Sequence, residues 1–128
     1  MNNPFINEYG TKYWKNDKGK LHRIDGPAIE DINGSKFWYI NGKRHRLNEP
    51  ACEYADGTKY WYLNGQRHRV DGPAIEWADG IKEWYLNGQR YRLDGPAVEY
   101  PEDGTIYWSI QHYNISSINN FLSWLQNE

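Results

Sequence analysis

The stretch TKYWYLNGQRHRVDGPAIEWADG, from Thr58 to Gly80, recurs along the chain with a period of 23 residues. The segment before it reads SKFWYINGKRHRLNEPACEYADG, and the segment after it reads IKEWYLNGQRYRLDGPAVEY. A fixed period between 20 and 50 residues indicates a repeat architecture. The anchors of the register are Arg23, Arg46, Arg69 and Arg92, the prolines Pro27, Pro50, Pro73 and Pro96, and the Asn-Gly pairs that begin at Asn41, Asn64 and Asn87.

Each unit is predicted to contain short strands between turns. The segment KYWYL (Lys59–Leu63) is rich in strand-forming residues. It precedes Asn64-Gly65, a strong hairpin signal because both residues tolerate a positive φ. The segment QRHRV (Gln66–Val70) is then the returning strand. Asp71-Gly72-Pro73 ends that strand, because proline has no N–H to donate.

The rest of the unit leads into the next copy. AIEWA (Ala74–Ala78) is predicted to be a short third strand, and Asp79-Gly80 the turn that follows it. Since no unit can bury a face alone, neighbouring units must stack. We expect one mainly β domain over residues 1–128, with units at about 9–31, 32–54, 55–77 and 78–100, a partial unit at 101–113 and a C-terminal helix at 114–126.

The expected C-terminal helix is amphipathic. Its apolar residues Ile115, Ile118, Leu122 and Leu125 fall on one helical face. An uncovered sheet edge invites pairing with other chains. We interpret the helix as a cap on the C-terminal edge of the sheet, and a partner-binding helix is the alternative.

The quoted unit resembles the MORN-like repeats (membrane occupation and recognition nexus), which have an NGKRHG…ADG core. It is closer to a divergent form, WYLNGKLHRxDGPAxEYxDG, found in bacteriophage and giant-virus proteins. The resemblance covers about residues 9–113 and implies an elongated, twisted antiparallel sheet or solenoid that serves as a binding surface. Arg46, Arg69 and Arg92 replace the glycine of ordinary MORN units, so the lipid-binding role of those units is not expected here.

Composition narrows the functional classes. The 128 residues have a net charge of −2, which gives no general attraction to polyanions. There is no apolar run of about 20 residues, as a membrane span requires, and the first residues, MNNPFINEYG, lack the pattern of a signal peptide. The single cysteine, Cys52, stands where other units have Ile or Val and is interpreted as a buried hydrophobe. These features favour a reducing cytoplasm, and a host cytoplasm if the chain is phage-encoded.

Repeated histidines could indicate a metal site. His22, His45 and His68 share one position, where the fourth copy is Tyr91. Units that each add two strands place successive copies about 10 Å apart, whereas a metal needs its histidine ligands at about 2 Å. We therefore expect no metal and no cofactor, and interpret these residues as a ladder of packed, hydrogen-bonded side chains.

Repeated carboxylates could indicate acid–base catalysis. They are Asp25, Asp71 and Asp94 before Gly-Pro, and Glu30, Glu53, Glu76 and Glu99 in the third strand. An active site needs one asymmetric constellation, whereas these residues are copied in every unit. The aspartates are expected to cap their own turns and the glutamates to pair with arginines, so the chain is predicted not to be an enzyme.

The arginines and the residues that break the repeat are the candidate binding residues. Alternation along a strand predicts that Arg67 and Arg69 share a face, so that stacking produces a double row of arginines. The column Arg23, Arg46, Arg69 and Arg92 is interpreted as structural, and the column Arg44, Arg67 and Arg90 as freer to bind a partner. Trp77 stands where Asp31, Tyr54 and Tyr100 stand, and Tyr91 replaces histidine. Arg67, Arg90, Tyr91 and Trp77 are predicted to form one aromatic–cationic patch.

The tryptophans recur at one position and are interpreted as packing. They are Trp14, Trp38, Trp61, Trp84 and Trp108. The leading functional hypothesis is a non-enzymatic protein that binds an acidic protein partner, such as a phage-encoded inhibitor of a host defence protein. One alternative is a choline-type or glycan-binding repeat, in which aromatic rings form cages. The other is single-stranded nucleic-acid binding, which the acidic residues of each unit disfavour.

Overall fold

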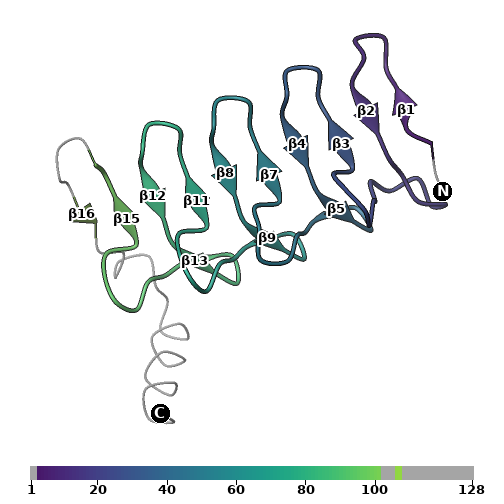
Figure 1. Cartoon of the computed structure of the whole chain (residues 1–128). Coiled ribbons are helices and arrows are strands. Elements are labelled where there is room, and N and C mark those ends of the chain that lie inside the picture. The colour runs from purple at the N-terminus through teal and green to yellow at the C-terminus, as the bar shows by residue number, and fades with distance from the viewer. Residues whose placement is uncertain (1–2, 102–105, 108–128) are drawn as a thin grey trace.

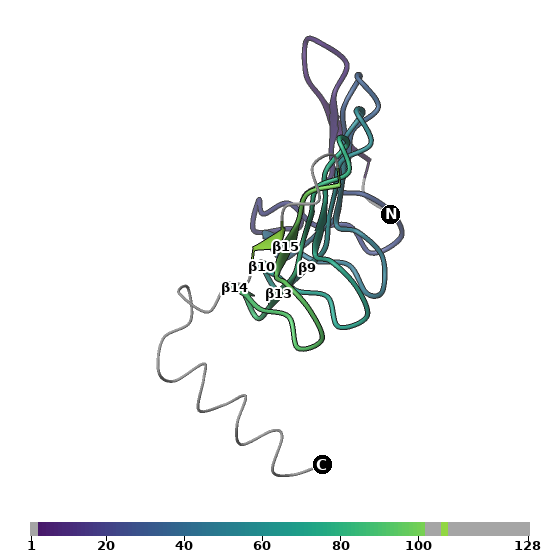
Figure 2. The same cartoon turned by 90° about the vertical axis from the view of Figure 1, so that its left-hand side faces the viewer.

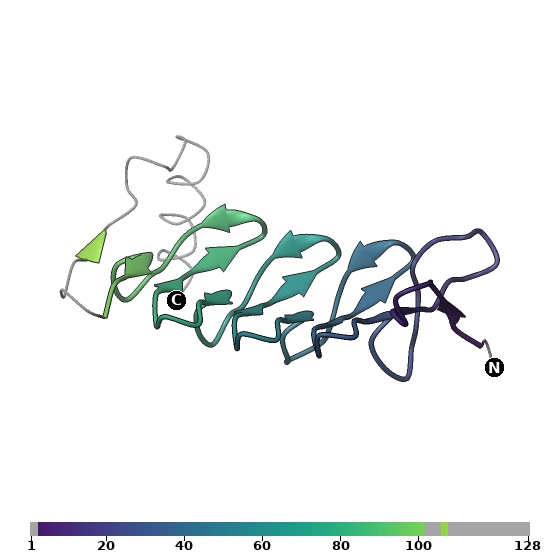
Figure 3. The ribbon, with the colours of Figure 1, turned by 90° about the horizontal axis from the view of Figure 1, so that it is seen from above.

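The computed structural model describes residues 3–101 and 106–107, and these form a row of repeated hairpins (Figure 1). The main sheet is antiparallel with the strand order β1-β2-β3-β4-β7-β8-β11-β12-β15-β16. Its strands are β1 (Phe5–Ile6), β2 (Lys12–Tyr13), β3 (Ile29–Glu30), β4 (Lys36–Phe37), β7 (Cys52–Glu53), β8 (Lys59–Tyr60), β11 (Ile75–Glu76), β12 (Lys82–Glu83), β15 (Val98–Glu99) and β16 (Ile106–Tyr107). Seen from above, the row is elongated (Figure 3). The mainly β, stacked-hairpin architecture predicted from the repeat is confirmed.

Smaller hairpins lie beside the main sheet. They are β5 (Tyr39–Ile40) with β6 (Lys43–Arg44), β9 (Tyr62–Leu63) with β10 (Gln66–Arg67), and β13 (Tyr85–Leu86) with β14 (Gln89–Arg90). Their turns are the predicted Asn-Gly pairs, in which Asn64 has a φ of 49° and Gly65 a φ of 81°. Positive φ at both central residues is the geometry that favours Asn-Gly in hairpins.

The strand boundaries differ from the prediction. The segment 59–63 is not one strand, because the chain passes from the main sheet to the small hairpin at Trp61. The returning strand ends at Arg67 rather than at Val70. The third segment contributes Ile75 and Glu76, which pair with both β8 and β12. Each unit therefore adds two strands to the main sheet, through hairpins that the Asp-Gly turns close.

The cross-strand register gives the main sheet two different faces. One row of opposed residues alternates in charge: Lys12, Glu30, Lys36, Glu53, Lys59, Glu76, Lys82 and Glu99. The adjoining row is apolar except for one glutamate: Phe5, Tyr13, Ile29, Phe37, Cys52, Tyr60, Ile75, Glu83 and Val98. Because successive residues of a strand point to opposite faces, one face is charged and the other is largely aromatic and aliphatic.

The core is thin and lies where the chain leaves the main sheet. The alanines that follow the repeated prolines are buried, and Ala51 and Ala74 have no exposed surface. Trp61, Ala74, Ile75 and Tyr85 form one cluster. Cys52 is fully buried in the neighbouring cluster, which confirms its predicted role as a small apolar residue. Small residues at these positions allow the backbones of neighbouring hairpins to approach closely.

Two ladders of hydrogen bonds join neighbouring units. The Nδ1 atoms of His22, His45 and His68 accept from the N–H of the next unit's turn asparagine at 2.9–3.0 Å, which confirms the predicted histidine ladder. At the tips of the hairpins of the main sheet, the Ser35 hydroxyl accepts from the Ala55 N–H at 2.9 Å. The Thr58 hydroxyl accepts from the Ala78 N–H at 3.1 Å. The Ser35 and Thr58 side chains are buried, so the bonds at the tips satisfy polar groups that stacking would otherwise leave without partners.

The predicted C-terminal helix at 114–126 lies outside the described residues. So does most of the predicted partial unit at 101–113, of which the structure describes residue 101 and the strand β16. No helix of the described part of the chain is long and apolar enough to span a membrane.

Candidate functional site

The first arginine column is structural. Arg23, Arg46, Arg69 and Arg92 place their guanidinium Cζ atoms 3.7–3.9 Å from the ring centroids of Trp14, Trp38, Trp61 and Trp84. Each also donates to the proline carbonyl four residues later at 3.1 Å. Each forms an ion pair with the glutamate seven residues later. The predicted arginine–glutamate pairing is therefore confirmed.

The aspartates next to this column bind arginine rather than their own turns. Asp25, Asp71 and Asp94 each accept from the Nε of the arginine two residues earlier at 3.0–3.1 Å. The expectation of self-capping was wrong, because these carboxylates bind the guanidinium instead. Each of these units thus has one guanidinium in contact with two carboxylates.

A glycine next to each of these aspartates makes room for the arginine. A Cβ at Gly72 would lie 2.9 Å from the Arg69 Cζ, and Gly26 and Gly95 show the same distance to their own arginines. The second unit has Glu49 at this position, and its loop follows a different path, with a φ of 63° at Asn48. The Glu49 carboxylate pairs with Arg46 at 2.9 Å.

The second arginine column was expected to be free to bind a partner, but its members are bound within the fold. Arg67 donates through Nε to the Tyr62 hydroxyl at 3.3 Å and through Nη1 to the Tyr85 hydroxyl at 3.4 Å. Arg44 makes the equivalent bonds to Tyr39 and Tyr62. Burial alone would lower the pKa of Arg67, but these hydroxyls hold it above its ordinary value.

The two arginine columns also lie on opposite faces of the main sheet. Arg69 pairs with Glu76 of the charged row, whereas Arg67 lies over Tyr60 of the apolar row. The predicted double row of arginines on one face is therefore wrong. The reason is that β10 ends at Arg67, so strict alternation does not extend to residue 69.

Residues that break the repeat gather on the apolar face around Glu83. The Glu83 carboxylate pairs with Arg90 at 2.9 Å and accepts from the Trp77 indole N–H. The Trp77 ring contacts Tyr60 edge-on, and Arg67 lies near the same tyrosine. The structure thus brings together Trp77, Arg90 and Arg67 from the predicted patch. Sequence reasoning missed Glu83, although its place in a column of Tyr13, Phe37 and Tyr60 marked it as a break in the repeat.

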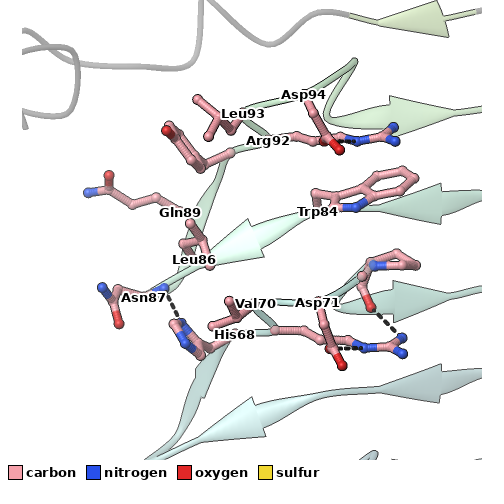
Figure 4. Close-up of a pocket in the computed structure, with 14 residues that line it drawn as sticks. His68, Val70, Asp71, Trp84, Leu86, Asn87, Gln89, Arg92, Leu93 and Asp94 are labelled. Atoms are coloured by element: carbon pink, nitrogen blue, oxygen red, sulfur yellow. Dashed lines mark hydrogen bonds and ion pairs between the residues drawn. The ribbon is translucent and has the colours of Figure 1, made fainter. Parts of the chain in front are cut away.

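Tyr91 lies elsewhere, in a groove between the third and fourth units. The groove has a volume of about 1060 Å³ and is lined by side chains of the loops 68–73 and 91–94 together with residues of β13 and the turn after it. Figure 4 shows Val70 and Leu93 beside this space, with Leu86 and Gln89 between them. Trp84, already covered by Arg92, also lines it. Tyr91 is therefore not part of the Trp77 cluster.

Four aliphatic residues of the connecting loops are exposed at the repeat spacing. We call Ile24, Leu47, Val70 and Leu93 the loop row. Their exposed fractions are 85%, 67%, 83% and 44%. Seen from one end of the sheet, the loops of successive units lie one behind another (Figure 2). The sequence has an aliphatic residue directly after each repeated arginine. Its exposure was not predicted, because residues 66–70 were expected to form one strand with strict alternation.

Exposed carboxylates accompany the loop row. The side chains of Asp25, Glu49, Asp71 and Asp94 are 64–86% exposed, whereas the arginines that they contact are 18–23% exposed. The charge that this surface offers to a partner is therefore negative. Among the described residues, no group of three or more histidine, cysteine, aspartate or glutamate side chains is placed to hold a metal ion.

Comparison of the chain with protein families, with curated proteins and with solved structures finds no match.

Proposed function

We propose that this chain is a non-enzymatic repeat protein that binds a protein partner through the loop row. The observation that carries the proposal is the exposure of an aliphatic side chain at the same place in four successive units. Exposed apolar side chains gathered on one surface beside charged residues are typical of an interaction site. Their removal from water contributes about 25 cal/mol per Å² of apolar surface to association, before the entropic costs of binding are subtracted.

The partner that the surface favours is basic rather than acidic. The expectation of an acidic partner came from the second arginine column, whose members bind tyrosine hydroxyls within the fold. The exposed charges next to the loop row are carboxylates. Charge complementarity speeds association and selects between partners, so the proposed partner has a basic surface.

The alternative functions find less support. A choline-type or glycan site needs open aromatic faces, but each described tryptophan of the repeated column is covered by its own arginine. Nucleic-acid binding needs exposed cations along a groove, whereas carboxylates flank this groove. The repeated glutamates that could serve an enzyme are engaged by arginines in each unit.

We further propose that the chain is a divergent MORN-like repeat protein that acts in a host cytoplasm as a phage-encoded modulator of a host protein. The support is the resemblance of the 23-residue unit to repeats of bacteriophage proteins, together with a fold in which each unit adds one hairpin to an elongated sheet.

The experiment is a capture from nuclease-treated bacterial lysate by the immobilised chain, with identification by mass spectrometry. Val70→Ser/Leu93→Ser removes two members of the loop row. Because Leu93 is only 44% exposed, thermal unfolding of the double variant is measured alongside the capture to show that it is folded. The matched control is Ile32→Ser, an exposed aliphatic residue at a hairpin tip outside the row. We expect one dominant protein, retained by the wild type and the control and lost by the double variant. Equal retention by all three proteins would contradict the proposal.

A further inference from the structure

We infer that the segment recognised by the loop row is a basic amphipathic helix that lies along the row and presents apolar side chains with a heptad spacing. This inference rests on the proposed function and names the chemistry of the partner. It follows from three properties of the surface, namely the spacing of the units, the size of the groove and the sign of the exposed charge.

The spacing of the row matches the repeat of a helix. Each unit adds two strands to the main sheet, so equivalent positions recur about every 9.6 Å. Seven residues of an α-helix rise about 10.5 Å. A helix with apolar residues at the first and fourth positions of each heptad therefore presents one apolar layer for each unit of the row.

The groove between the third and fourth units is too large for one side chain. Its volume is about 1060 Å³, just above the range of about 300–1,000 Å³ for clefts that hold a whole small ligand. Val70 and Leu93 border it and Leu86 lies between them. A helix can place the first and fourth residues of one heptad into such a space together. A polyproline helix presents a single residue on one face for each rise of about 9.3 Å.

The charge around the groove selects a basic helix. Asp71 and Asp94 are 86% and 84% exposed and lie at its border. The arginines they contact are covered by tryptophan and paired also with glutamate. The residue that covers the next Asn-Gly turn is a lysine in the first two units, Lys20 and Lys43, but Gln66 in the third. The turn at Asn87, which borders the groove, therefore has a neutral neighbour where the equivalent turns of the earlier units have a lysine.

The test uses synthetic 21-residue peptides and fluorescence anisotropy with the full chain. The matched peptide has leucine at the first and fourth positions of each heptad and lysine at the flanking positions. One control has the same composition with the leucine stripe dispersed, a second has glutamate in place of lysine, and a third is a proline-rich peptide with leucine at every third position. We expect the matched peptide to bind at least tenfold more tightly than each control.

Variants of the protein place the contact. Val70→Ser/Leu93→Ser should weaken binding of the matched peptide at least tenfold, and Ile32→Ser should leave it unchanged. Asp71→Asn/Asp94→Asn should flatten the salt dependence of its affinity. The inference would be overturned if the dispersed-stripe, acidic or proline-rich peptide bound as tightly as the matched peptide. It would also be overturned if Val70→Ser/Leu93→Ser and Ile32→Ser bound the matched peptide equally well. If no peptide binds while capture from lysate still depends on Val70 and Leu93, the proposal of a helical ligand is wrong and the proposed function stands. If that capture is also independent of these residues, the helical ligand and the proposed function are both wrong.

Discussion

At the scale of single residues, the repeated Arg–Trp stack leaves no room beside it. In the third unit the guanidinium of Arg69 lies between the Trp61 ring and the backbone of Gly72. A Cβ at Gly72 would come within 2.9 Å of the Arg69 Cζ, closer than a nonbonded contact allows. The arginine is long and flexible, but four kinds of contact hold it in this place: the ring, a proline carbonyl, an aspartate and a glutamate.

We therefore predict that Gly72→Ala displaces Arg69 and lowers the free energy of unfolding by about 1–3 kcal/mol, the usual cost of overpacking. Denaturant unfolding followed by tryptophan fluorescence measures it. The control is Glu49→Ala at the same position of the second unit, where a Cβ is already present. Loss of its exposed ion pair should change stability by less than about 1 kcal/mol. Equal losses for the two variants would show that the close approach at Gly72 is unimportant.

Cys52 is a second case in which one residue's surroundings decide its chemistry. Burial raises the pKa of the Cys52 thiol to about 11, although the nearby Arg44 acts in the opposite direction. We predict that the native protein reacts with a thiol reagent at pH 8 only as fast as it unfolds, since the thiolate is the reactive form. The denatured protein should react at once. Fast labelling of the native chain would contradict the burial of this thiol.

The same raised pKa predicts a pH dependence of stability. A thiol whose pKa is higher in the folded state keeps its full contribution below the unfolded pKa and loses it as pH rises toward 11. At about 1.4 kcal/mol per pKa unit, the loss is about 2–3 kcal/mol. Cys52→Val removes the titrating group, so its stability relative to the wild type should rise between pH 8 and 11. A constant difference over that range would contradict the prediction.

At the scale of the elements, two linked sequence differences between units occur at the tips of the main-sheet hairpins. Thr58 accepts from the Ala78 N–H, and Ser35 accepts from the Ala55 N–H. In the next unit the hydroxyl residue is replaced by Ile81, and the donor position is Pro101, which has no N–H. The Pro101 ring instead lies close to Gly80 of the neighbouring tip. Acceptor and donor are thus absent together, so neither group of the hydrogen bond is left without the other.

This pairing predicts the outcome of a double-mutant cycle. Thr58→Val should cost about 0.5–1.5 kcal/mol, the usual net contribution of one hydrogen bond, because it removes the acceptor of the Ala78 N–H. The further change Ala78→Pro should recover part of that loss in the valine background but destabilise the wild type. Thermal and urea unfolding of the four proteins would give the coupling free energy. A coupling near zero would mean that the hydroxyl bond contributes nothing to the stacking of the tips.

The elements also show what sequence can and cannot predict here. The period and the Asn-Gly and Asp-Gly turns follow from local chemistry and were confirmed, whereas the unit 58–80 has four short strands, β8 to β11, in place of the three predicted. The break at Trp61 could not be predicted, because strand-forming residues continue on both sides of it. That break and the early end of β10 decide which face each arginine reaches. The predicted patch was therefore found only in part, and Glu83 and the loop row were found only in the structure.

At the scale of the whole molecule, the fold is a one-dimensional array. Hydrogen bonds between units join neighbours, as the bonds from the Asn64 N–H to His45 and from the Asn87 N–H to His68 illustrate. The stability of such an array is approximately a sum of unit and interface terms. We predict that deletion of residues 58–80, one complete unit, leaves a folded protein with a lower unfolding midpoint and the same circular dichroism per residue. Loss of the β spectrum would contradict the one-dimensional description.

We propose that the partner binds along the loop row of this array and not at the arginine–aromatic cluster of the apolar face. The decisive measurement is NMR of the chain with labelled methyl groups and indole N–H groups, recorded while the captured partner is added. Ile24, Leu47, Val70 and Leu93 report on the row, Ile32 on the hairpin tips, and the Trp77 indole on the Glu83 cluster. We predict that the methyl signals of the four residues of the row shift, while the Ile32 methyl signals and the Trp77 indole signal do not. Shifts centred on Trp77, with the row unchanged, would contradict the claim and return the binding site to the cluster around Arg67 and Arg90.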